Sequence, residues 1–122
     1  MPDGFTDFAF AHRGLHGVAG PENSPSAFRA AINRGYGIEL DVQSSADSRA
    51  MVFHDDNLER LTAETGPIRA RKTSELGAIR LKRGADMIPT LDAVLRLVAG
   101  RVPLLIEVKD QDGQMGPNVG PL

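Results

Sequence analysis

The stretch GIELDV at residues 37–42 decides the fold, because apolar and acidic residues alternate along it. In an extended strand successive side chains point to opposite faces, so the three aliphatic side chains share one face and Glu39 and Asp41 share the other. The sequence therefore predicts a strand with one apolar face and one face that carries two carboxylates.

Further short apolar runs, separated by helices and loops, predict an α/β fold. Strands are expected at residues 8–11, 37–42, 51–53 and 104–108. Ser24 followed by Pro25 predicts the start of a helix that Gly35 ends. Thr90 is the predicted N-cap of a second helix, which ends at Gly100.

The alternation of strands and helices favours a parallel sheet with polar residues at its carboxyl edge. A doubly wound sheet and a TIM barrel both satisfy this pattern. Residues 43–50 form a polar connection that is shorter than the dozen or so residues of a parallel crossover, so a hairpin is the local alternative. Residues 55–88 are expected to form an irregular excursion with a short helix from Thr73, and residues 110–122 a loop-like tail.

Composition excludes several classes of protein. The 122 residues include no cysteine, so thiolate nucleophiles and cysteine-ligated metals are excluded, and any metal must bind oxygen or imidazole. A net charge of −2 gives no footprint for nucleic acid or an acidic membrane surface. Since the sequence has neither a signal-peptide pattern nor an apolar run near the roughly 18 residues of a membrane span, we expect a cytoplasmic domain without a membrane anchor.

Carboxylates on two predicted strands suggest a metal site. Glu39 and Asp41 are like charges on one face, which is unfavourable away from water unless a cation lies between them. Glu107 and Lys109 repeat the same spacing on the last strand and add a carboxylate and an ammonium. The alternatives are an edge strand with a solvated acidic face and, for the second pair, a surface ion pair.

Two histidines each follow a predicted strand. An imidazole exchanges protons near pH 7, so His12 and His54 are candidates for an acid and a base. Arg13 offers a planar fork for phosphate oxygens. The alternative is that each histidine is a structural hydrogen-bonding residue, which is also the interpretation we keep for His16.

The succession of motifs resembles the glycerophosphodiester phosphodiesterase family. The motifs are HRG at 12–14, PENS at 21–24, IELDV at 38–42, VFHD at 52–55, LERLT at 58–62, IPTL at 88–91 and IEVK at 106–109. The resemblance implies a TIM barrel that hydrolyses a small glycerophosphodiester to glycerol 3-phosphate and an alcohol, with a divalent metal, usually Mg²⁺ or Ca²⁺. It also implies that the strand at 51–53 is parallel and that residues 55–88 are the family's small insertion.

The resemblance also implies roles for individual residues. The metal-binding carboxylates would be Glu39, Asp41 and Glu107, the acid/base pair His12 and His54, and the phosphate-binding cations Arg13 and Lys109. Glu22 and Asn23 match an element that borders the family's site and receive no catalytic role. Which histidine is the acid and which the base is left open.

Length modifies this expectation. A TIM barrel typically takes about 250 residues, so the chain is expected to form about the first half of a barrel, with four strands. The competing hypothesis is a catalytically incompetent half-barrel that only folds or self-associates through its exposed edges. A barrel phosphodiesterase of the phosphatidylinositol-phospholipase or sphingomyelinase D type is a third alternative, which the Ile-Pro-Thr-Leu and His-Asp elements fit less well.

Overall fold

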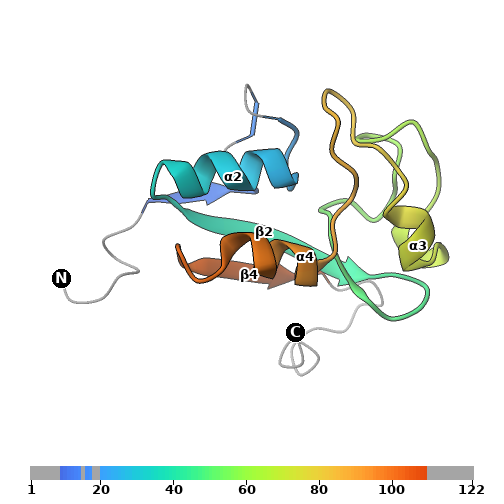
Figure 1. The fold of residues 1–122 in the computed structure, drawn as a ribbon. Helices are drawn as coiled ribbons and strands as arrows, with labels where there is room; N and C mark the ends of the chain where they lie inside the picture. Colours follow the sequence, from blue (N-terminus) through green and yellow to red (C-terminus); the bar gives the residue numbers. More distant parts are fainter. Residues whose placement is uncertain (1–8, 15, 18–19, 110–122) are drawn as a thin grey trace.

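The computed structural model describes residues 9–14, 16–17 and 20–109, which form a four-stranded sheet with helices packed on it (Figure 1). The strands are β1 (Phe10–His12), β2 (Gly37–Ser44), β3 (Ala50–Val52) and β4 (Leu104–Val108). The helices are α2 (Pro25–Asn33), α3 (Thr73–Leu76) and α4 (Leu91–Val98), with a 3₁₀ helix η1 (Ile68–Ala70). The start of the first predicted strand and the predicted tail at 110–122 lie outside the described residues.

Strand β2 is the centre of the sheet and pairs with all three other strands. It runs parallel to β1 and to β4, as an α/β fold requires. It runs antiparallel to β3, with Val42 opposite Val52. The sheet is open, and its three parallel strands place their carboxyl ends at one edge.

The antiparallel β3 corrects one expectation. The resemblance implied a parallel third strand, and that prediction is wrong; the hairpin alternative is confirmed. The physical reason is the short connection, in which the Ser45 N–H donates to the Arg49 carbonyl at 2.9 Å and the Ser48 N–H to the Ser45 carbonyl at 3.0 Å. Such a tight turn reverses the chain and cannot carry it across the sheet.

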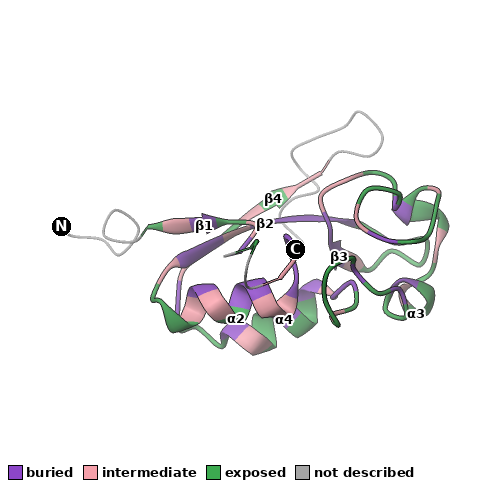
Figure 2. Ribbon diagram, turned by 90° about the horizontal axis from the view of Figure 1, so that it is seen from above, coloured by how far each residue is buried: buried purple, intermediate pink, exposed green. Residues whose placement is uncertain are grey.

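The apolar face of β2 packs against the two long helices. Ile38, Leu40 and Val42 are fully buried, as is Phe28 of α2, and Val94 of α4 is nearly so. Figure 2 shows α2 and α4 on the same side of the sheet. Burial of this face leaves the opposite face of β2 for its polar side chains.

The two long helices begin where the sequence predicts, and one of them also ends there. Ser24 Oγ accepts a hydrogen bond from the Ala27 N–H at 3.1 Å, and Thr90 Oγ1 accepts one from the Ala93 N–H at 3.1 Å. Gly35 follows α2 in the left-handed conformation, with φ 74°. Helix α4 ends one residue earlier than predicted, because Ala99 already adopts a left-handed φ of 49°.

The excursion at residues 55–88 is built around a small core of its own. Its buried apolar side chains, together with two from the β3 region, are Met51, Phe53, Leu58, Ile68, Leu76, Ile79, Leu81 and Ile88. The expected short helix from Thr73 is present as α3. None of the helices in the described part of the chain is long and apolar enough to cross a membrane, and the cytoplasmic location stays a prediction.

We expect Gly14→Ala to destabilise the chain by about 2 kcal/mol or more, through backbone strain and steric overlap together. Gly14 has a φ of 82°, and an added Cβ would lie 2.9 Å from Ala27 Cβ and 2.9 Å from Phe28 Cδ1. Gly35→Ala is the matched control, because its φ is also positive but nothing lies within 4 Å of the added Cβ. Urea unfolding of both variants measures the difference. Equal losses would contradict the close packing of Gly14 on α2.

Candidate active site

Three carboxylates converge on the polar face of the sheet, as the spacing predicted. Asp41 on β2 lies directly opposite Glu107 on β4 in the parallel register. One oxygen of each of Glu39, Asp41 and Glu107 lies within 4.8 Å of the others. Because the helices cover the other face of the sheet, a solute can approach this carboxylate triad without displacing the core.

Burial of the triad increases from its edge to its centre. Glu107 is exposed, the Glu39 side chain is 13% exposed, and Asp41 is 2% exposed. Burial, together with the charge of Asp41, raises the pKa of Glu39 above its ordinary value of 4.5, and His12 offsets only part of this rise. His12 Nε2 lies 3.6 Å from Glu39 Oε1. The fold therefore holds these negative charges together at an energetic cost.

The triad fits a hard divalent cation. Ligand oxygens at about 2.0–2.6 Å from an ion lie at most about 4–5 Å apart, which matches the observed spacing. Glu39 Oε1 is buried without a hydrogen-bond partner, as is Asn23 Oδ1. Buried polar atoms are rarely left in this state unless a ligand completes their bonding. An all-oxygen donor set suits Mg²⁺ or Ca²⁺ rather than a softer metal.

The loop after β1 brings a cation to the triad. Arg13 has a left-handed φ of 58°, rare for a non-glycine residue, and its N–H donates to the Glu39 carbonyl at 2.6 Å. Its Nη1 donates to Glu22 Oε2 at 3.1 Å. Its Nε lies 3.3 Å from Asp41 Oδ2, close enough for an ion pair but not aligned for a hydrogen bond. Two carboxylates therefore hold the Arg13 guanidinium beside the triad.

Asn23 supports the same carboxylate oxygen as Arg13. Its Nδ2 donates to Asp41 Oδ2 at 3.2 Å, and its backbone N–H donates to the Arg13 carbonyl at 2.8 Å. Asn23 also has a left-handed φ, of 56°. Strained backbone concentrates at functional sites, and here it aims two side chains at Asp41.

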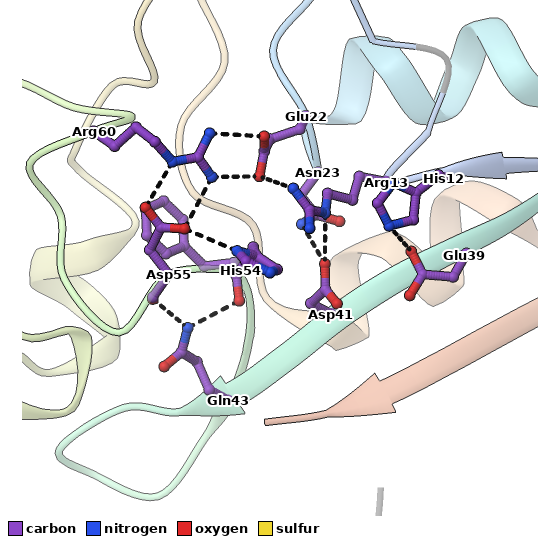
Figure 3. A network of polar contacts seen from close by, with 11 residues as sticks. His12, Arg13, Glu22, Asn23, Glu39, Asp41, Gln43, His54, Asp55 and Arg60 are labelled. Atoms are coloured by element: carbon purple, nitrogen blue, oxygen red, sulfur yellow. Dashed lines mark hydrogen bonds and ion pairs between the residues drawn. The ribbon is translucent and has the colours of Figure 1, made fainter. Parts of the chain in front are cut away.

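His54 lies at the end of a chain of charged side chains (Figure 3). Its Nδ1 is 2.8 Å from Asp55 Oδ1. Arg60 donates two hydrogen bonds to Asp55 and two to Glu22, at 2.8–3.0 Å. We call Glu22, Arg60 and Asp55 the Arg60 bridge. It connects the loop after β1 with the excursion that follows β3.

The Arg60 bridge also explains why the pKa values of two carboxyl groups, Glu22 and Asp55, are lowered. Hydrogen bonds from Arg60 lower the pKa of Asp55 to about 2, against the opposing effect of burial. Burial pushes the pKa of Glu22 upward, but the hydrogen bonds from Arg60 and the charges of Arg13 and Arg60 outweigh it, so the pKa is lowered. Both carboxylates therefore stay ionised at neutral pH.

His54 and Lys109 meet at a hollow of about 670 Å³ beside the triad. The residues that line it are His54, Asp55, Asp56, Asn57, Glu107, Val108 and Lys109. In Figure 3 Arg13 and Asp41 lie between His12 and His54. His12 is 64% exposed and His54 29% exposed. All seven predicted site residues thus belong to the triad, lie beside one of its carboxylates or line this hollow.

The chain is similar to known proteins over most of its length. The glycerophosphoryl diester phosphodiesterase family matches residues 12–120. The chain belongs to this family. It is 39% identical over 107 residues to the glycerophosphodiester phosphodiesterase of Bacillus altitudinis, a match that covers 82% of this chain and 43% of that protein.

Solved structures of the family agree in fold. The glycerophosphodiester phosphodiesterase of Agrobacterium tumefaciens superposes with a TM-score of 0.79 at 36% identity, covering 86% of this chain and 48% of that one. A phosphodiesterase of Oleispira antarctica, in complex with the product sn-glycerol-3-phosphate, superposes at 0.80 with 31% identity, covering 87% and 46%. These neighbours are TIM barrels, and the open sheet matches the amino-terminal part of one. The chain spans about half the length of the relatives it matches.

Gln43 and Arg60 support the site, although their contacts were not predicted from the sequence. Gln43 was expected in a loop, but β2 continues to Ser44, and Gln43 Nε2 donates to the carbonyls of Phe53 and Asp55 at 2.9 and 2.6 Å. A signal existed, since Gln43 follows Glu39 and Asp41 at the same two-residue spacing. Arg60 lies in the LERLT motif at 58–62, but no spacing in the sequence predicts its contact with Glu22, which only the fold creates.

We expect Glu39→Gln to raise the free energy of unfolding of the metal-free chain at neutral pH. A raised pKa means that ionised Glu39 is less stable in the folded chain than in the unfolded chain, so removing the charge removes a penalty. This gain should shrink as the pH falls toward 4.5, because wild-type Glu39 then takes up a proton in the folded state.

Urea unfolding in EDTA at neutral and mildly acidic pH measures this gain. Glu64→Gln is the control, because Glu64 is an exposed carboxylate paired with Arg71 at 3.3 Å, away from the triad. No gain is expected from it. A Glu39→Gln chain that is less stable than wild type at neutral pH would contradict the unfavourable burial of this charge.

Proposed function

We propose that this chain carries the metal-binding and proton-transfer residues of a phosphodiesterase that hydrolyses glycerophosphodiesters to glycerol 3-phosphate and an alcohol. The observation that supports it is the convergence of Glu39, Asp41 and Glu107 within 4.8 Å in a member of the glycerophosphoryl diester phosphodiesterase family. The Oleispira antarctica relative, which was solved with sn-glycerol-3-phosphate, supports the choice of product.

The carboxylate triad would hold a divalent ion, Mg²⁺ or Ca²⁺. When bound there, such an ion supplies Lewis-acid chemistry that polarises the phosphoryl oxygen. Glu39 and Asp41 supply fixed carboxylates from β2, and exposed Glu107 closes the site from β4. Asn23 keeps Asp41 oriented through the 3.2 Å hydrogen bond to Oδ2.

The two histidines would move protons and the two cations would bind phosphate. One imidazole of the pair His12 and His54 takes the proton of the attacking oxygen, and the other gives a proton to the oxygen of the leaving alcohol. Arg13 and Lys109 bind the phosphate oxygens, and Arg13 is already oriented for this by Glu22 and Asp41. Water is added across one phosphoester bond in the overall reaction.

A non-catalytic role is the alternative that one observation favours. The polar face of the open sheet also carries Leu105, which lies opposite Glu39 on β4 and is 54% exposed. A large apolar side chain at a sheet edge favours pairing with another chain. On this alternative the chain self-associates through its edges and lacks turnover.

Turnover of glycerophosphocholine and glycerophosphoethanolamine tests the proposal. The assay is run with Mg²⁺, Ca²⁺ or EDTA on the chain alone and on a chimera that adds the rest of the barrel from the Agrobacterium tumefaciens relative. Hydrolysis that EDTA abolishes in the chimera supports the phosphodiesterase. A folded chimera that releases no glycerol 3-phosphate with either metal would overturn it.

Replacing His12 or His54 by Ala should lower the rate of the active form by about a hundredfold or more, because each would remove an acid or a base. His16→Ala is the matched control, since His16 is exposed and does not line the hollow that His54 shares with Glu107 and Lys109. The rate of that variant should stay near wild type. Near-normal turnover after both of the first two substitutions would return His12 and His54 to structural roles.

Metal binding is tested on the chain without any need for turnover. Mg²⁺ or Ca²⁺ should raise the unfolding temperature of the wild type in proportion to the logarithm of the metal concentration above its Kd. Glu107→Gln should lose most of this rise, and because Glu107 is exposed the variant should fold normally. Glu64→Gln is again the control. An equal rise in wild type and Glu107→Gln would rule Glu107 out as a ligand.

A further inference from the structure

Arg60 lies at the meeting point of two segments that are far apart in the sequence. Its Nη1 and Nη2 donate to the two oxygens of Glu22 at 3.0 and 2.9 Å. Its Nε and Nη2 donate to the two oxygens of Asp55 at 2.8 and 2.9 Å. Each carboxylate therefore receives a paired hydrogen bond, which fixes its plane as well as its position.

The orientation of Asp55 decides what His54 can do. Asp55 Oδ1 lies 2.8 Å from His54 Nδ1, and an ionised carboxylate can only accept a hydrogen bond. Neutral His54 must then carry its proton on Nδ1, which leaves a lone pair on Nε2. His54 lines the same hollow as Glu107 and Lys109. The lone pair on Nε2 is therefore carried by a side chain of the proposed site.

His54 is held in two ways: Gln43 binds the backbone on both sides of it, and Asp55, held by Arg60, contacts its ring. Gln43 fixes the backbone, because its Nε2 donates to the carbonyls of Phe53 and Asp55 on either side of His54. The Asp55 side chain is 23% exposed, and among the described residues Arg60 holds it by hydrogen bonds to both of its oxygens in addition to its contact with His54. Without Arg60 it would be free to turn toward water. Arg60 is itself half exposed and adds little to the core.

We propose that Arg60 is a positioning residue of the phosphodiesterase site, which holds Asp55 against His54 so that neutral His54 is protonated on Nδ1 and keeps Nε2 open for proton transfer. The inference rests on the proposed function, because it assigns a catalytic proton transfer to His54. It goes further by naming Nε2 as the atom that exchanges the proton and Arg60 as the residue that keeps this nitrogen unprotonated in neutral His54.

Arg60 can hold Asp55 in place because its guanidinium is also bound to Glu22, which is itself fixed. Glu22 is 9% exposed, and it is also bound by Arg13 Nη1 at 3.1 Å. Arg13 in turn lies beside Asp41 of the triad. Arg60 thus ties the position of His54 to the same loop that positions Arg13, and the phosphate-binding and proton-transfer groups keep a constant spacing.

The test is the protonation state of the His54 ring nitrogens, measured by ¹⁵N NMR on the intact chain. At a pH at which the His54 ring is neutral, wild type should show a protonated Nδ1 and an unprotonated Nε2. In Arg60→Gln the two forms should become mixed. Arg80→Gln is the matched control, since it removes an exposed arginine from the same excursion, outside the Arg60 bridge, and it should keep the wild-type pattern.

A second variant covers the case in which Arg60→Gln does not fold. Arg60→Lys keeps the positive charge, but a single ammonium cannot make paired hydrogen bonds to both Glu22 and Asp55. We expect a mixed His54 tautomer in this variant as well. A wild-type tautomer in a folded Arg60→Lys or Arg60→Gln chain would overturn the proposal and leave Arg60 as a structural brace.

Kinetics of the active chimera separate this inference from the proposed function. Arg60→Lys should lower kcat by about 10- to 100-fold with KM nearly unchanged, because a misplaced proton acceptor slows the chemical step without weakening phosphate binding. Unchanged kcat would overturn the positioning role. If no form of the protein turns over, the proposed function fails, whereas the NMR result still decides what Arg60 does to His54.

Discussion

The site depends on the alternation of side chains along β2. Ile38, Leu40 and Val42 must be buried against α2 and α4, and this forces Glu39, Asp41 and Gln43 onto the opposite face. A shift of register by one residue would put two carboxylates into the apolar core, which is far costlier than any local rearrangement. Hydrophobic burial on one face therefore sustains an unfavourable cluster of like charges on the other.

The alternation of apolar and polar side chains along β2 is a local pattern, and the features that could be predicted from the sequence are of this local kind. Helix starts at Ser24 and Thr90 follow from local hydrogen bonding, and the parallel pairing of β2 with β4 follows from their shared pattern. The convergence of Glu39, Asp41 and Glu107 needed only this pairing and the two-residue period. The helix starts depend on residues that are neighbours in the sequence, and the convergence of the carboxylates depends on a single pair of strands, β2 and β4.

The features that the sequence did not predict depend instead on contacts between distant parts of the chain. The direction of β3 depends on how tightly residues 45–49 turn. The family resemblance implied the wrong direction, whereas the short connection had left the hairpin open as an alternative. The excursion at 55–88 has no regular period, because its apolar residues pack around a compact core instead of along one helix or strand. Arg60 is 38 residues from Glu22, so their contact exists only once that core has folded beside the loop after β1. The left-handed backbone of Arg13 is likewise a product of its surroundings.

The same long-range contacts determine how much of the positive charge is available to a substrate. Arg13 uses Nη1 on Glu22 and places Nε beside Asp41, so its guanidinium is held in one orientation before any phosphate arrives. Four of the five N–H donors of Arg60 are bound to two carboxylates, so Arg60 carries no free pair of donors for an anion. Of these two arginines, Arg13 therefore keeps more donors for an anion, while Arg60 uses its charge to hold the carboxylates in place. In a site built in this way, the binding of an anion costs little conformational entropy, because the side chains that would otherwise have to be ordered are ordered already.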